Sequence, residues 1–445
     1  MSYGKASTTV LEFSESRTGV LNWLRKCPAQ ADVALSVDGL TKVRLGGIER
    51  LRPDVADLVR VVAALHTADC TVRRPSATPE DPIAFGRRIA VRVPVQNPET
   101  WKRAGNELLG LLVWLTDDEW DVSFVSLSAP RYNQPSLVED PCPVVLFSGG
   151  LDSLAGSIML LAEDLDMVTL SISTNNRTTG VQSRGWHALR RGYPAQLKGR
   201  HRVKLEVDAP GVDPESSQRT RGLVCLGLGG AMASAMGGTE LVTCENGIGA
   251  INLPMLEGQC GAMMSRNVHP GTLALATRLF GAVLQKPVLI REPFLFRTKR
   301  ELVQGALSLG WTGLDRLTRS CDAFPRYDRP CFRCTSCLYT ELALGNGDHY
   351  VHISHATSKG TGAVAWYAME QQARRIGGCL SASHPWTAMT AEFPILQKAH
   401  DSVVSGWALS SEDAQERLVD LYRRHVSEWK PFAEAVLRSA RERCA

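Results

Sequence analysis

The stretch that decides the fold reads PVVLFSGGLDSLAG and covers residues 143–156. Its apolar start predicts a buried strand, and apolar residues from Leu154 onward recur at helical spacing. Two glycines, Gly149 and Gly150, stand between these elements. Glycine permits positive φ and a close backbone approach, and a helix N-terminus attracts anions. The stretch therefore predicts a strand–loop–helix unit that cradles a pyrophosphate.

The polar residues of this loop support the same interpretation. Ser148 and Ser153 offer hydroxyl donors to phosphate oxygens. Asp152 cannot favour an anion by itself, so it is expected to orient the loop or to help hold Mg²⁺. The loop lacks the G-x-x-x-x-G-K-[ST] pattern, and the glycines of residues 227–237 miss the G-x-G-x-x-G spacing. We interpret residues 227–237 as a closely packed helix of small residues.

Short apolar segments follow the loop at regular intervals, with segments of helical length between them. This alternation predicts an α/β fold, with a parallel sheet that carries helices on both faces. The four further expected strands are residues 167–174, 201–208, 239–246 and 286–293.

The chain before the loop has a different pattern. Residues 33–127 are typical of an α+β region, and a polar, proline-rich stretch at 128–143 predicts a domain boundary. From about His349 the pattern becomes helical and amphipathic, with Ser410 and Asp413 as an N-cap pair. Within the first region we expect strands at 88–95 and 120–127 and a helix at 99–115. The predicted division is an N-terminal α+β accessory domain (1–138), an α/β domain (139–348) and a helical C-terminal region (349–445).

Composition places the chain among ordinary globular proteins. Of its 445 residues, 44% are hydrophobic and 22% are charged, and the net charge of +4 is too small to imply a nucleic-acid partner. The polar N-terminus has no signal-peptide core, and no apolar run is long enough to span a bilayer, so we expect a cytoplasmic protein without a membrane partner. A basic run at 184–204 is interpreted as a solvated connector, with a surface for phosphates or an acidic partner as the alternative.

Four cysteines form a second motif. They follow a C-x9-C-x2-C-x2-C pattern, which fits a tetrahedral Zn²⁺ site. An iron–sulfur cluster and a redox thiol pair are the alternatives. The expected ligands are Cys321, Cys331, Cys334 and Cys337.

The S-G-G-x-D-S sequence of the loop resembles the PP-loop of the ATP pyrophosphatases, the adenine-nucleotide alpha hydrolase-like fold. The resemblance implies a Rossmann-like sheet, cleavage of ATP between its α and β phosphates, and adenylation of a substrate oxygen with Mg²⁺. The ATP-binding residues that it implies are Phe147, Ser148, Gly149, Gly150, Leu151, Asp152 and Ser153, of which Ser148, Asp152 and Ser153 are the catalytic candidates.

Loop and cysteine cluster together, in this order, resemble QueC, the 7-cyano-7-deazaguanine synthase family. Residues 293–310, with Lys299 as a further catalytic candidate, and the T-x-S-C of residues 318–321 match that family, and the resemblance covers about 143–344. It implies that residues 139–348 form a QueC-like ATPase domain with zinc. The implied reaction is ATP-dependent activation of 7-carboxy-7-deazaguanine, after which ordinary family members add ammonia and form a nitrile.

The chain also departs from that family. It is about twice as long, and CENGIGAINLP at residues 244–254 is more similar to the QueC-like proteins of bacterial antiphage defence, of which the QatC type is an example. That resemblance implies a ligase that couples the activated acid to a protein amine, the N-terminus of a partner encoded in the same operon. Nitrile synthesis, tRNA modification or sulfur transfer, and a non-catalytic nucleotide-binding subunit are the alternatives.

Three further residues are candidates for substrate binding. Glu245 and Asn246 follow an expected strand end, where α/β folds bind ligands, and could pair with the guanine edge. An N-cap or turn at Asn246 is the alternative. Arg221 could hold a substrate carboxylate, with a surface salt bridge as its alternative. The sequence shows no Ser-His-Asp signature and no glutaminase-type Cys-His set.

Overall fold

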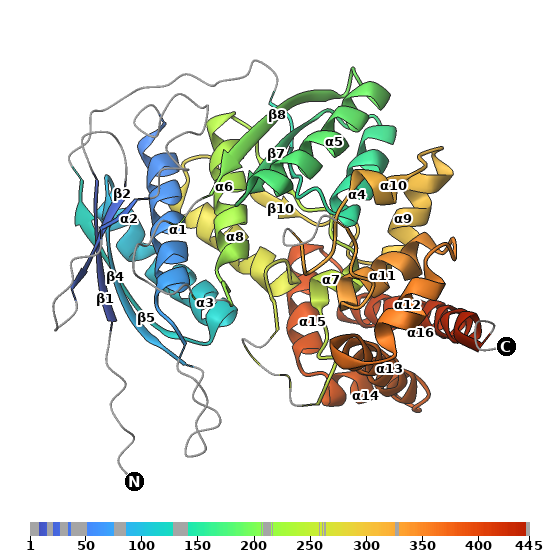
Figure 1. Cartoon of the computed structure of the whole chain (residues 1–445). Coiled ribbons are helices and arrows are strands. Elements are labelled where there is room, and N and C mark those ends of the chain that lie inside the picture. The colour runs from blue at the N-terminus through green and yellow to red at the C-terminus, as the bar shows by residue number, and fades with distance from the viewer. Residues whose placement is uncertain are drawn as a thin grey trace, which may run out of the picture.

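The computed structural model describes residues 9–15, 21–26, 34–36, 51–74, 86–127, 141–205, 207, 215, 217–257, 259, 261, 264–324 and 329–441. Two five-stranded sheets dominate the described chain, and helices lie between them and around them (Figure 1). The proline-rich stretch that predicted a boundary lies almost wholly outside the described residues.

The second sheet is fully parallel and contains the opening stretch. Its strand order is β10-β9-β6-β7-β8. After β6 the chain adds β7 and β8 on one side and then crosses to add β9 and β10 on the other. The carboxyl ends of β6 and β9 therefore flank the topological switch point, where open α/β sheets bind ligands. The five strands are β6 (Val144–Leu146), β7 (Met167–Ser173), β8 (Leu197–Lys204), β9 (Glu240–Val242) and β10 (Leu289–Arg291).

Helices cover both faces of this sheet, as the alternating pattern predicts. Val145 packs in the core on the side of α4, α5 and α9, whereas Val144 packs in the core on the side of α6 and α8. The α/β fold with a parallel sheet is thus confirmed. The helices are α4 (Leu151–Ala162), α5 (Asn176–Gly192), α6 (Arg221–Ala235), α7 (Gly247–Ile251), α8 (Pro270–Val283), α9 (Lys299–Ser308), α10 (Leu314–Leu317) and α11 (Thr335–Leu344).

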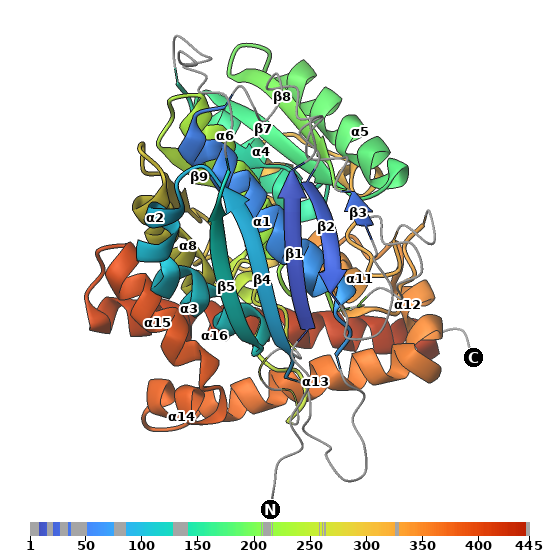
Figure 2. The same ribbon diagram turned by 90° about the vertical axis from the view of Figure 1, so that its left-hand side faces the viewer.

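The first sheet lies across the molecule from the second and is mixed. Its order is β3-β2-β1-β4-β5, with antiparallel pairing among β1–β3 and parallel pairing of β4 with β1 and β5 (Figure 2). The expected helix at 99–115 is two helices that meet at Ala104, since Gly105 is a poor helix former at the junction. The elements are β1 (Thr9–Glu15), β2 (Leu21–Lys26), β3 (Ala34–Ser36), α1 (Pro53–Thr71), β4 (Arg88–Val95), α2 (Pro98–Arg103), α3 (Gly105–Thr116) and β5 (Glu119–Ser126).

Helix α1 joins the two sheets into one core. Every residue from Asp54 to Thr71 is buried, because α1 packs on β4 with one side and on α6 with the other (Figure 1). The small residues of α6 allow this approach: a Cβ on Gly227 would lie 2.6 Å from Val62 Cγ1. The interpretation of residues 227–237 as a closely packed helix is confirmed through residue 235.

The C-terminal region is helical, as predicted, and packs on the edge of the parallel sheet where the strands end. Ser410 caps the last helix, accepting a hydrogen bond from Asp413 N at 3.0 Å. Leu421 and Tyr422 of that helix share a core with Ile248, Ile251 and other residues that follow β9. The helices are α12 (Tyr350–Thr357), α13 (Gly360–Leu380), α14 (Pro385–Glu392), α15 (Ile395–Gly406) and α16 (Ser411–Arg441).

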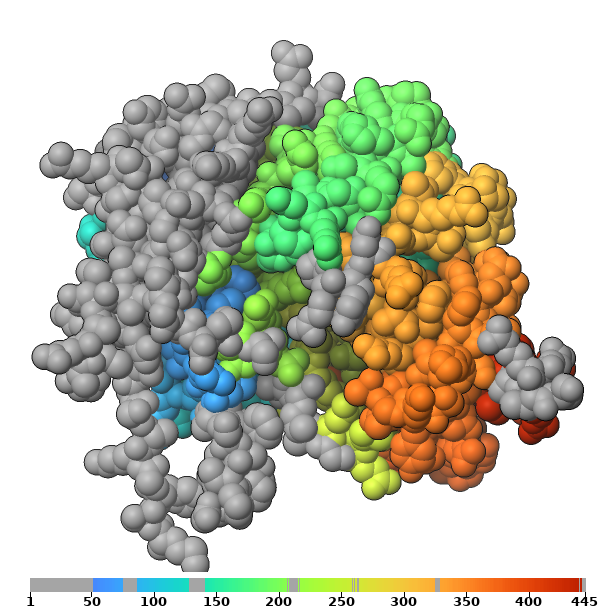
Figure 3. Space-filling model, viewed as in Figure 1, coloured from blue at the N-terminus to red at the C-terminus, as the bar shows by residue number. Residues whose placement is uncertain are grey.

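On the face shown in Figure 3, the yellow-green chain lies deeper than the green surface of α5 and the orange surface of the C-terminal helices. In the described part of the chain, no helix combines the length and the apolar character that crossing a membrane requires.

Candidate functional site

The glycine loop leaves β6 at the switch point and enters α4 directly. Gly149 has a φ of 84°, in the left-handed region that favours glycine. A Cβ at Gly149 would lie 3.1 Å from Gln182 Cγ and 3.2 Å from Gln182 N on α5. Gln182 also donates a hydrogen bond from Nε2 to Ser148 O at 3.3 Å. The loop therefore requires glycine here for its conformation and for its contact with α5.

Hydroxyl groups surround Gly150, the residue before α4. Ser148 Oγ accepts a hydrogen bond from Gly150 N at 3.2 Å and lies 3.1 Å from Ser153 Oγ. Ser153 Oγ donates to Gly150 O at 3.0 Å. Ser320 Oγ accepts from Leu151 N at 3.0 Å. The start of α4 thus combines backbone N–H groups with three hydroxyls, which is an arrangement suited to an anion.

Phe147 and Leu151 contribute to the loop through their backbones. Both side chains are buried in the core, and Phe147 packs so closely on α5 that a Cβ at Gly185 would lie 2.9 Å from Phe147 Cζ. Phe147 N donates to Leu170 O of β7 at 2.8 Å, which continues the sheet to the edge of the loop.

Asp152 connects the first turn of α4 to two other elements. Its Oδ1 accepts a hydrogen bond from Asn246 Nδ2 at 2.9 Å, and its Oδ2 pairs with Lys299 Nζ. Asn246 follows β9, and Lys299 begins α9, so the fold brings three separate predicted site residues together. Asp152 raises the pKa of Lys299 against the lowering effect of burial, and Lys299 keeps its positive charge.

Two glutamates lie beside this pair. Burial, followed by the nearby Asp152 charge, raises the pKa of Glu245 to about 8. Burial raises the pKa of Glu292 well above its usual value. Glu292 accepts hydrogen bonds from Glu245 N at 3.0 Å and from Thr243 Oγ1. Burial thus favours the neutral, protonated form of both glutamates, whereas Lys299 keeps its positive charge.

Asn246 confirms the alternative that the sequence left open for it. Its Oδ1 accepts from Gly249 N at 3.0 Å and caps α7, while its Nδ2 is bound to Asp152. Both ends of the amide are therefore engaged within the protein. Glu245 keeps more freedom, because only Asn246 Nδ2, at 3.2 Å, contacts its carboxyl among the hydrogen bonds of the described residues.

Arg221 forms no hydrogen bond or ion pair with this group among the described residues. It is exposed at the first position of α6. Burial lowers the pKa of His66 on α1 and the Arg221 charge adds to this, whereas burial raises the pKa of Cys225 and the Arg221 charge only opposes that rise. The N-terminus of α6 is fixed by α1, since Thr220 donates to Asp69 of α1 from both its backbone N, at 2.8 Å, and its Oγ1, at 2.9 Å.

One cysteine–histidine contact occurs in the buried helix α1. Cys70 Sγ lies 3.6 Å from His66 Nε2. Burial raises the pKa of Cys70 to about 12 and lowers that of His66 to about 4. Both groups are neutral at physiological pH, so the contact does not produce an activated thiolate.

Helix α16 holds the segments that carry the two partners of Asp152. Thr298, the N-cap of α9, donates from Oγ1 to Glu428 Oε1 at 2.7 Å, and Arg424 pairs with Glu301 at 2.7 Å. At Gly247, next to Asn246, a Cβ would lie 2.6 Å from Leu421 Cδ2 of α16. The C-terminal helix therefore helps to position Lys299 and Asn246.

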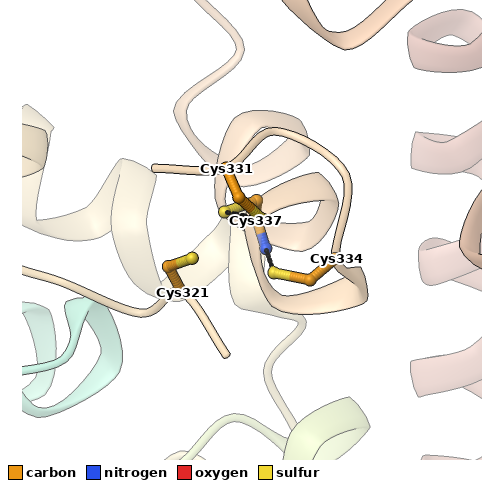
Figure 4. A group of neighbouring side chains, drawn as sticks. All are labelled: Cys321, Cys331, Cys334 and Cys337. Atoms are coloured by element: carbon orange, nitrogen blue, oxygen red, sulfur yellow. Dashed lines mark hydrogen bonds between the residues drawn. The ribbon is translucent and has the colours of Figure 1, made fainter. Parts of the chain in front are cut away.

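The four predicted cysteines converge (Figure 4). Their sulfur atoms all lie within 4.8 Å of one another. The Sγ atoms of Cys331 and Cys337 are 3.9 Å apart, close to the edge of about 3.8 Å expected for a tetrahedron with Zn–S bonds of about 2.3 Å. All described cysteines are free thiols. The cluster is a possible metal site compatible with zinc, and it is the one group of three or more potential ligand side chains found among the described residues.

Hydrogen bonds within the cluster favour a thiolate. Cys334 caps α11, and its sulfur accepts from Cys337 N at 3.4 Å. A hydrogen bond from the Cys337 thiol lowers the pKa of Cys334 to about 6, and the same bond raises the pKa of Cys337. Thiolates are the form that binds metal.

Sequence reasoning missed Glu292, Ser320 and Glu428 as members of the site. Glu292 follows β10 as Glu245 follows β9, so its position at a strand end was a usable signal. Ser320 lies inside the T-x-S-C motif but had no assigned role. Glu428 is one of several acidic residues on an amphipathic helix, and nothing in the local sequence distinguishes it.

Comparisons of the chain with protein-family models, with curated proteins and with solved structures find no match.

Proposed function

We propose that this protein is an ATP-dependent ligase of the PP-loop type that adenylates a 7-deazaguanine carboxylate and transfers it to an amine. The proposed acceptor is the N-terminus of a partner protein in antiphage defence. One observation carries the proposal: the S-G-G-x-D-S loop lies at the switch point of a parallel sheet, beside a charged pair formed by Asp152 and Lys299.

The first step forms an acyl-adenylate. A carboxylate oxygen of 7-carboxy-7-deazaguanine attacks the α-phosphorus of ATP, the α–β bridging bond breaks, and pyrophosphate leaves. In this proposal the hydroxyls of Ser148 and Ser153, which hydrogen-bond to each other and to Gly150 O, exchange those bonds for the pyrophosphate and hold it together with the N–H groups at the start of α4. Lys299 supplies a positive charge for the negative charge that develops, and Mg²⁺ shares this role when bound.

The second step transfers the acyl group. The amine nitrogen attacks the acyl carbon, AMP leaves with the bonding electron pair, and the amine loses a proton to solvent. A protonated Glu245 is neutral and can donate a hydrogen bond, and once ionised it can accept from the N–H groups of a guanine edge. Since Asn246 is engaged as a cap, Glu245 is the better candidate for contacting the base.

The cysteine cluster has a structural role in this proposal. Zn²⁺ held by Cys321, Cys331, Cys334 and Cys337 would have four protein ligands and no open position, as in structural sites.

Intact-protein mass spectrometry tests the proposal. The enzyme is incubated with ATP, Mg²⁺ and 7-carboxy-7-deazaguanine, with and without proteins encoded by neighbouring genes. We expect AMP formation and a partner that gains the mass of the acid minus water, with both lost in Asp152→Asn. Free amide or nitrile formed only with ammonia would instead support the nitrile synthase. Absence of AMP under both conditions would refute adenylation of this acid.

A further inference from the structure

One short segment belongs to both the cysteine cluster and the glycine loop. Arg319 N donates to Gly149 O at 3.2 Å, and Ser320 Oγ accepts from Leu151 N at 3.0 Å. The next residue, Cys321, is one of the four clustered cysteines. Three consecutive residues, which we term the strap (319–321), thus connect the possible metal site with the loop.

The strap is fixed at its other end by α10. Thr318 is buried and donates from Oγ1 to Leu314 O at 2.8 Å. The guanidinium of Arg319 turns back and donates from Nη1 to Asp315 O at 2.9 Å. Helix α10 itself packs on α4 and α5, the two helices that contain the loop's neighbours. Because α10 holds one end of the strap, the position of Cys321 determines the path of its other end.

Ser320 acts on the part of the loop where an anion would sit. Leu151 is the first residue of α4, so its N–H has no partner within the helix. A Cβ at Gly150 would lie 3.3 Å from Ser148 Oγ and 3.5 Å from Ser320 Oγ, so the two hydroxyls flank the same Cα. Because Ser320 accepts the Leu151 N–H, its own hydroxyl hydrogen remains to be donated.

We propose that Ser320 is a positioning residue for the glycine loop and that the strap makes the shape of this loop depend on metal in the cysteine cluster. The inference rests on the proposed function only in naming nucleotide phosphates as the ligand. With metal bound, Cys321 is fixed and the strap holds the loop in its binding conformation. Without metal, Cys321 is released and the strap loses one of its two anchors.

The test uses hydrogen exchange and calorimetry on the full chain. Exchange of peptides covering residues 147–155 is measured without nucleotide, in the zinc-loaded protein and after removal of zinc by a chelator. ATP affinity in the presence of Mg²⁺ is measured on the same samples. The variants are Ser320→Ala, the hydroxyl-retaining Ser320→Thr, and the control Ser308→Ala, which removes an exposed hydroxyl that donates to Gln304 O within α9.

We expect zinc removal to accelerate exchange in residues 147–155 while peptides of α1 stay protected, which distinguishes a local effect from unfolding. Ser320→Ala should show the faster exchange already with zinc bound and should weaken ATP binding about tenfold, the loss of one strong hydrogen bond. Ser320→Thr should recover part of the affinity, and Ser308→Ala should behave as the unmodified protein.

Two outcomes would overturn the inference. One is unchanged loop exchange after zinc removal from the unmodified protein, a result that needs no variant to fold. The other is a Ser320→Ala protein with normal exchange and affinity. A protein that binds no ATP at all would instead refute the proposed function, and the exchange measurements, made without nucleotide, would still decide the role of the strap.

Discussion

The pair formed by Asp152 and Lys299 should be coupled in stability by about 2 kcal/mol or more. Their side chains are 11% and 12% exposed, so each alanine or methionine replacement leaves the other charge largely buried. Removing one partner of a buried pair costs about 3–5 kcal/mol. For Asp152→Ala we expect a loss of stability at the lower end of this range. The pKa of Glu245 falls when Asp152 is absent, and an ionised Glu245 can then pair with Lys299.

A double-mutant cycle measures this coupling. Urea unfolding at pH 7 is followed for the unmodified protein, Asp152→Ala, Lys299→Met and the double variant. Each single variant should lose about 3 kcal/mol, and the double variant about 4 kcal/mol, because it buries no unpaired charge. Lys286→Met is the matched control, since Lys286 is exposed and its loss should change stability by less than about 0.5 kcal/mol. Additive losses, with a coupling below about 0.5 kcal/mol, would refute the pairing.

Two further predictions concern the loop and the C-terminal helix. Gly149→Ala should cost about 1–2 kcal/mol of stability and weaken ATP binding, because φ at Gly149 is 84° and Gln182 leaves little space for a Cβ. The control is Gly180→Ala, where an added Cβ would meet no atom within 4 Å. A normal ATP affinity of Gly149→Ala, measured by calorimetry, would contradict the prediction. Burial raises the pKa of Glu428 from 4.5 to about 7, so the folded protein binds a proton on this carboxyl more tightly than the unfolded chain does. The protein therefore loses stability as pH rises from about 4.5 through 7. Between pH 6 and pH 8 the melting temperature should therefore fall less in Glu428→Gln than in the unmodified protein, and equal falls would disprove the assignment.

The local units of the fold were predictable from the sequence because each rests on local rules. The glycine loop and the helical C-terminus appear where periodicity and turn residues place them, and each predicted strand of the parallel sheet overlaps an observed one. The strand bounds were less predictable: β8 begins at Leu197, before the expected residue 201, and β9 and β10 are shorter than their apolar segments. The cysteine cluster was predictable for the same reason, since three of its members lie within seven residues of one another.

Helix α1 shows why other parts were not predictable. It is buried on all sides yet contains Asp57 and Asp69, which break the apolar pattern of a buried helix. Their partners are distant in sequence: Asp57 accepts from the backbone N of Gln96 and Asn97, and Asp69 pairs with Arg87. The local sequence around a buried charge does not differ from that around an exposed one when the partners of the buried charge are distant in the chain.

The candidate site residues likewise divide into those that a local motif identified and those that only long-range contacts reveal. Lys299 and Asp152 were named from motifs, but their contact joins α9 to α4 across 147 positions of sequence. Glu292 and Ser320 take part only because β10 and the strap lie beside β9 and the loop, and such adjacency is a property of topology.

The position of α16 has a consequence for the synthesis of the protein. The helix that contacts the Thr298 cap and Gly247 follows both sheets in the chain, so those contacts can form only after the ribosome has translated α16. A nascent chain that has completed both sheets still lacks the restraint on Lys299 and Asn246. A chain that ends before α16 would therefore contain the glycine loop and the cysteines without a fully assembled site.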